Sequence, residues 1–99
     1  MLENFTVDTF AVGDIFRVFY GEGQYVEITL VQAFDSKFKS PFLERDPFCL
    51  VFAGKKEIWI EAGCYSMEQV KVGKFEMSIT PTAPLKGDGQ FNYYEAAFS

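Results

Sequence analysis

The chain has 99 residues, of which 48% are apolar and 18% aromatic, and its formal net charge is −5. This length suits one domain (residues 1–99) with a single core, and the apolar content is too high for a disordered chain. The acidic balance argues against nucleic acid and anionic membranes as partners, because both attract proteins through clustered lysine and arginine.

The chain begins with a predicted helical turn over residues 4–12, which packs as a lid and ends at Gly13. A strand is predicted over residues 15–20, because large apolar side chains alternate there with a period of two. We interpret Arg17 in this strand as a solvated residue and not as a ligand group. The sequence Gly21-Glu22-Gly23 then predicts a hairpin turn.

The longest predicted strand covers residues 25–34. Its inward face is expected to carry the apolar residues Val26, Ile28, Leu30 and Phe34. Gln32 interrupts this set, so we expect that it bonds to the backbone or marks a bend in the strand.

A loop is predicted over residues 35–46, and it carries three large apolar residues, Phe38, Phe42 and Leu43. Loops rarely expose that much apolar surface without a role. The three side chains either tuck under the sheet or reach a partner, and the sequence leaves both alternatives open.

Four further strands are predicted over residues 48–53, 57–61, 63–67 and 73–80, and residues 53–56 are expected to form a turn. Two of these strands alternate clearly, with inward faces made of Phe48, Leu50 and Phe52 and of Phe75, Met77 and Ile79. An aromatic strand over residues 90–98 ends the chain. About seven short strands joined by tight turns predict an all-β fold, either an antiparallel sandwich or a small closed barrel.

Phenylalanine accounts for 12 residues of this small chain. One core of this size is not expected to hide that much aromatic surface. We expect the surplus to lie in a subunit interface or a binding groove.

The chain has two cysteines, Cys49 and Cys64, which are too few for a disulfide scaffold. They fall on predicted strands that could be neighbours, so a bridge between them is geometrically possible. The sequence Met1-Leu2-Glu3-Asn4-Phe5 lacks the basic and apolar regions of a signal peptide. We therefore expect synthesis in the cytoplasm, with both thiols free.

Histidine is absent, which excludes catalysis by imidazole and zinc sites that contain histidine. Glu57 with Glu61, or Asp35 with Asp46, could be imagined as the acid and base of a glycosidase. Pairs of acids arise often by chance in an acidic domain, so we do not expect a catalytic pair here. We expect no enzyme activity, no cofactor and no metal site.

Trp59 lies between Glu57 and Glu61 and has two interpretations. It covers one end of the core, which we favour because tryptophan is highly buried on average. Alternatively, Trp59 and Tyr65 form stacking surfaces for a carbohydrate, with Glu57 and Glu61 as hydrogen-bond acceptors. This second interpretation corresponds to a small ligand-binding barrel.

Several elements match a recurring pattern: Phe48-Cys49-Leu50-Val51-Phe52-Ala53-Gly54, Gly63-Cys64-Tyr65, Gly73-Lys74-Phe75, Pro81 and Tyr94-Glu95-Ala96-Ala97-Phe98. The pattern resembles that of a family of small, uncharacterised bacterial and phage-associated β domains. Residues Val12-Gly13-Asp14-Ile15-Phe16 are similar to the start of the same domain. The resemblance implies a structural role near tail or virion proteins, and it supplies no catalytic residue.

Together, these features favour a non-enzymatic assembly subunit, such as a phage tail or virion component, that is oligomeric or docks onto partner subunits. Its expected contact residues are the loop residues Phe38, Phe42 and Leu43, together with Trp59 and Tyr93.

Overall fold

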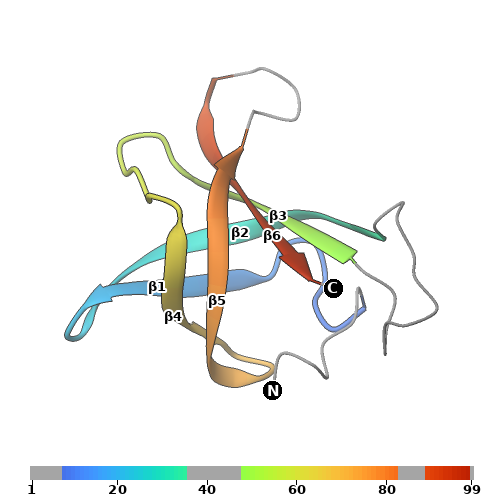
Figure 1. The fold of residues 1–99 in the computed structure, drawn as a ribbon, viewed down its shortest axis with the longest axis horizontal. Coiled ribbons are helices and arrows are strands. Elements are labelled where there is room, and N and C mark those ends of the chain that lie inside the picture. Colours follow the sequence, from blue (N-terminus) through green and yellow to red (C-terminus); the bar gives the residue numbers. More distant parts are fainter. Residues whose placement is uncertain (1–7, 36–47, 83–88, 99) are drawn as a thin grey trace.

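The computed structural model describes residues 8–35, 48–82 and 89–98. These residues form six strands: β1 (Ile15–Gly21), β2 (Gln24–Asp35), β3 (Phe48–Lys55), β4 (Gly63–Gln69), β5 (Gly73–Thr82) and β6 (Phe91–Phe98). Neighbouring strands are antiparallel, and the order β1-β2-β3-β6-β5-β4 closes into a barrel where β1 pairs with β4. In Figure 1, β4 and β5 stand upright while β1 and β2 run across the view. The prediction of an all-β antiparallel fold is confirmed, and of the two predicted alternatives, a sandwich and a small closed barrel, the structure has the barrel.

The predicted seventh strand, over residues 57–61, is wrong. These residues are irregular and connect β3 to β4. The six strands already pair around the ring, which leaves no place for another. The predicted turn over residues 53–56 also begins too early. Ala53 and Gly54 remain in β3, because they pair with β2 on one side and with β6 on the other.

The connection between β3 and β4 has to cross the barrel. In the ring, β3 and β4 are separated by β2 and β1 on one side and by β6 and β5 on the other. Every other pair of consecutive strands consists of direct neighbours. Residues 56–62 therefore pass over one end of the barrel instead of along its wall, and Figure 1 shows this connection looping away from the strands.

The core fills the barrel with the inward residues of all six strands. The two inward faces predicted for residues 48–53 and 73–80 are confirmed, since all six of their large apolar side chains are buried. The rings of Phe48 and Phe98 stack at 4.6 Å, and those of Phe16 and Phe52 meet edge to face at 4.9 Å. Burial of one such side chain contributes about 1.5–3 kcal/mol, so this core is the main source of stability.

A β-bulge in β2 changes which residues face the core. The register with β3 shifts between Leu30 and Gln32, so Val31 is an extra residue without a direct partner. The expected bend at Gln32 is therefore present. The bulge also reverses the alternation, so that Ala33 packs against the core while Phe34 is 39% exposed. The prediction of an inward-facing Phe34 is wrong for this reason.

The segment before β1 closes the barrel as a lid, as predicted. Phe10 is buried, and its ring lies 4.8 Å from that of Phe16 and 6.3 Å from that of Phe75. Residues 8–14 form turns and bends and no helix, and residues 4–7 of the predicted helical turn lie outside the described residues. The Asp14 carboxylate accepts a hydrogen bond from the Ala11 N–H at 2.9 Å and lies 2.8 Å from the Lys71 ammonium. Asp14 thereby ties the lid to the turn between β4 and β5.

Both cysteines have free thiols, as expected. Cys49 lies on β3 and Cys64 on β4, and these strands are not neighbours in the barrel. No helix in the described part of the chain is long and apolar enough to cross a membrane.

Candidate functional site

Two side chains of β6 hold the connection across the barrel end. The Asn92 side-chain amide nitrogen lies 2.7 Å from the Ile58 carbonyl oxygen and 3.2 Å from those of both Lys55 and Lys56, and it shares its two hydrogens among these three acceptors. The Tyr94 hydroxyl accepts a hydrogen bond from the Ile60 N–H at 3.1 Å. Side chains of β6 thus satisfy backbone groups that would otherwise bond to a neighbouring strand.

Because the connection is anchored in this way, its residue Ile60 is buried in the core while the neighbouring Trp59 is exposed. Ile60 is buried and belongs to the core cluster. Trp59 is 62% exposed, and its ring lies 6.3 Å from that of Tyr94. The preferred interpretation of Trp59, as a cover for the core, is therefore wrong, because Ile60 and Tyr94 fill that place.

Beside Trp59 lies an open hollow of about 380 Å³. The described residues of its lining are aromatic and aliphatic, with a single acid: Val18, Tyr20, Val26, Ile58, Trp59, Ile60, Glu61 and Tyr65. A smaller hollow of about 180 Å³ shares Val26, Ile58 and Ile60 with it and extends to Tyr25, Glu27 and Lys55. The two hollows are therefore adjacent compartments along the connection. We refer to them together as the aromatic groove.

Three of the four residues predicted for a ligand site meet in this groove. Trp59, Glu61 and Tyr65 line the larger hollow, and the Tyr65 hydroxyl donates a hydrogen bond to the Glu61 carbonyl oxygen at 2.7 Å. Glu57 is exposed and does not line either hollow. The sequence thus identified this surface through Trp59 and its neighbours.

The structure supports a contact role by exposure for only one of the predicted partner-contact residues that it describes. Trp59 is strongly exposed, whereas Tyr93 is only 8% exposed and has little surface to offer a partner. Phe38, Phe42 and Leu43 lie outside the described residues, as does Asp46.

Sequence reasoning missed Tyr20, which is 61% exposed and lines the larger hollow. By alternation it shares a face with Phe16 and Val18, which are both buried. The register of β1 with β2 shifts between Phe19 and Gly21, so Tyr20 lies at a bulge where the strand leaves the barrel. In the sequence, the adjacent Gly21-Glu22-Gly23 turn was the only sign that the strand leaves the barrel at Tyr20.

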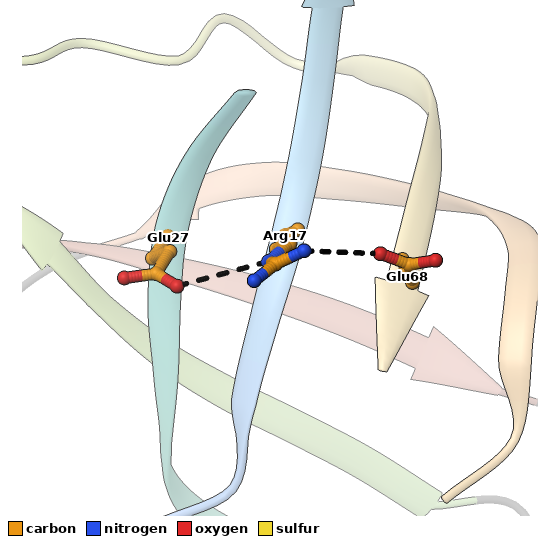
Figure 2. Close-up of polar contacts among 3 residues, drawn as sticks. All are labelled: Arg17, Glu27 and Glu68. Atoms are coloured by element: carbon orange, nitrogen blue, oxygen red, sulfur yellow. Dashed lines mark hydrogen bonds and ion pairs between the residues drawn. The ribbon is translucent and has the colours of Figure 1, made fainter. Parts of the chain in front are cut away.

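Arg17 occupies the outer face of the barrel, as the sequence predicts. It lies opposite Glu27 of β2 and opposite Glu68 of β4, and Figure 2 shows its guanidinium between the two carboxylates. The nitrogen–oxygen distances are 3.9 Å to Glu27 and 3.4 Å to Glu68. The guanidinium also lies 4.7 Å from the centre of the Tyr25 ring. Exposed pairs of this kind contribute up to about 1 kcal/mol each, and here they tie three strands together.

A further hollow, of about 590 Å³, lies beside this cluster. Its charged residues are Asp14, Arg17, Glu27 and Glu68, which take part in ion pairs with one another or with Lys71. No group of three or more metal-ligating side chains occurs among the described residues. The aromatic groove is therefore the better candidate for a binding site.

Comparison with known proteins identifies a family for nearly the whole chain. The model of a family described as "Domain of unknown function (DUF6916)" matches residues 5–98. No curated protein and no solved structure matches the chain. The match covers the entire barrel, from the lid to the last strand. The chain thus belongs to the DUF6916 family of domains of unknown function.

Proposed function

We propose that this protein is a non-enzymatic assembly subunit that docks onto partner protein subunits through the aromatic groove. The observation that carries the proposal is the joint exposure of Trp59 and Tyr20 around one apolar hollow. Interfaces concentrate tryptophan and tyrosine at their centres, since these rings bury much area at a small entropy cost. A barrel with a filled core gains nothing for its own stability from rings that remain in water.

The resemblance to phage-associated domains supports a more specific form of this proposal. On this basis the protein is made in the cytoplasm and becomes part of a tail or virion-like particle. Its partners are then copies of itself or other structural subunits, and it needs no cofactor.

Size-exclusion chromatography with light scattering tests the proposal. The protein is run alone and together with the purified products of adjacent genes. We expect a complex for the wild type and none for Trp59→Ala. Phe91→Ala is the matched control, because Phe91 is 44% exposed but does not line the groove. The proposal fails if the protein is monomeric and joins no neighbouring product, or if Trp59→Ala assembles normally.

A second candidate function is carbohydrate binding. Trp59, Glu61 and Tyr65 line the same hollow, which brings a carboxylate close to two aromatic rings. Titration of the tryptophan fluorescence with a panel of sugars tests this candidate. A saturable response that Trp59→Ala abolishes in calorimetry supports it, and a panel without any response removes it.

A further inference from the structure

The shape of the aromatic groove favours an extended occupant. Its two compartments have Val26, Ile58 and Ile60 in both of their linings and are therefore adjacent. Each compartment is small, at about 180 and 380 Å³. A chain that places one apolar group in each compartment fits this arrangement better than a single compact molecule.

The polar groups of the groove favour a ligand rich in hydrogen-bond acceptors. The Tyr65 hydroxyl already donates to the Glu61 carbonyl oxygen. Within the described part of the chain, neither the Trp59 indole N–H nor the Tyr20 hydroxyl makes a hydrogen bond. Both are donors on strongly exposed rings, so they are available to carbonyl oxygens of an incoming chain.

A polyproline II segment has these properties. It makes no internal hydrogen bonds, so its carbonyl oxygens remain free to accept them. Its period of three residues, with a rise of about 3.1 Å each, places prolines three apart on one face at a spacing of about 9 Å. Proline-rich segments bind grooves lined by aromatic rings, and they lose little entropy because they are already extended.

Charge indicates how such a segment is oriented. Among the residues that the structure describes, Glu61 is the only charged one that lines the larger hollow. In the smaller hollow Glu27 is accompanied by Lys55, and Glu27 also pairs with Arg17. Together with the net charge of −5, this arrangement favours a basic residue of the partner beside Glu61.

We propose that the aromatic groove binds a proline-rich segment of a partner protein in the polyproline II conformation, with an arginine or lysine of that segment beside Glu61. The inference rests on the proposed function and names the chemistry of the partner. A sugar fits the groove less well, because its many hydroxyl groups need both donors and acceptors, and Glu61 supplies the one carboxylate among the described lining residues of the larger hollow.

Trp59 is the only tryptophan of the chain, so its fluorescence reports directly on the groove. The full chain is titrated with a short synthetic proline-rich peptide that carries one arginine. We expect a saturable change with a shift to shorter wavelength, as the indole leaves water. A glycine- and serine-rich peptide of the same length and charge should give no saturable change.

A double-mutant cycle tests the orientation. Replacing the peptide arginine by glutamine should weaken binding to the wild type by about two- to fivefold, the range of an exposed ion pair. In Glu61→Gln the two peptides should bind equally. Calorimetry should show a loss of about tenfold or more for Trp59→Ala, as at an interface hot spot, and no change for Phe91→Ala.

The inference is overturned if the peptide gives no saturable response, if the control peptide binds equally well, or if binding survives Trp59→Ala. It is also overturned if only sugars give a response, or if self-association buries Trp59.

The size-exclusion experiment with the products of adjacent genes distinguishes a failure of this inference from a failure of the proposed function. If Trp59→Ala abolishes the complex with a partner subunit while proline-rich peptides do not bind, the docking role stands and only the partner chemistry is wrong. If peptides bind but no subunit co-elutes, the assembly role is wrong.

Discussion

The Tyr94 hydroxyl of β6 accepts a hydrogen bond from the Ile60 N–H, 3.1 Å away, in the connection that crosses the barrel end. The same hydroxyl lies 3.4 Å from the Ile58 carbonyl oxygen, to which it donates. Tyr94 is fully buried, so one core side chain both fills the barrel and fixes the segment that carries Trp59. The position of the aromatic groove depends on this contact.

Tyr94→Phe should therefore destabilise the protein. The substitution leaves the Ile60 N–H without its acceptor, and an unsatisfied buried donor costs about 1–3 kcal/mol. Urea denaturation followed by far-UV circular dichroism measures the change. Tyr20→Phe is the control, because its hydroxyl lies on an exposed ring, and it should leave the free energy of unfolding unchanged. Equal stability of Tyr94→Phe and the wild type would contradict this assignment.

Gly54→Ala should also destabilise the barrel, through overpacking. A Cβ at Gly54 would lie 3.2 Å from the Ile28 Cγ2 and 3.2 Å from the Tyr94 Cε2, and both side chains are buried. We expect a loss of about 1–3 kcal/mol in the free energy of unfolding. At Gly63 the nearest atoms to a Cβ would be those of the Tyr65 side chain, at 3.6 Å or more. Gly63→Ala is therefore the matched control, and a thermal melt in which both variants behave alike would refute the packing argument.

The ion pair between Asp14 and Lys71 predicts a pH dependence of stability. The pKa of Asp14 is lowered, first by the hydrogen bond from Lys71 and then by that from the Ala11 N–H. A carboxyl group with a lowered pKa stabilises the folded state above its unfolded pKa, and this contribution is lost as the pH falls through the folded value. Asp14→Asn should cost about 0.5–1 kcal/mol at pH 7, because the half-exposed Lys71 is screened by water.

The difference between wild type and Asp14→Asn should disappear well below about pH 4, where the carboxyl group is protonated. Urea titrations at neutral and acidic pH measure it. Lys71→Met should reproduce most of the effect at pH 7, since it removes the same pair. A difference that stays constant with pH would show that Asp14 acts only through its geometry.

The two thiols should react at different rates. Burial, followed by the nearby charge of Glu95, raises the pKa of Cys49, whereas the Cys64 side chain is exposed. The thiolate is the reactive form, so at pH 7–8 we expect Cys64 to react at least about tenfold faster with a disulfide reagent. Cys64→Ser should remove the fast phase and Cys49→Ser the slow one. A single rate for both thiols would disprove this difference in environment.

The sequence predicted the positions of the strands well, but it did not predict every inward face correctly. Predicted strand ends lie within two residues of the observed ones for all six strands, because alternation and turn glycines are local signals. The faces of β3 and β5 were correct, since the core selects the same residues that the pattern marks. The predicted face of Phe34 failed because a bulge adds one residue, and alternation cannot reveal such an insertion.

The sequence by itself determined an all-β domain of short antiparallel strands with a core rich in phenylalanine. The sequence determines this because neighbouring residues of a strand point to opposite faces, so inward apolar and outward polar residues alternate along the chain. Only the tertiary structure decided that β3 and β4 lie on opposite sides of the ring, which forces the connection across the barrel end. That crossing buries Ile60, leaves Trp59 in water and brings Trp59 beside Tyr20 and Tyr65. The groove is built from segments far apart in the chain, and which of them meet depends on how the barrel closes.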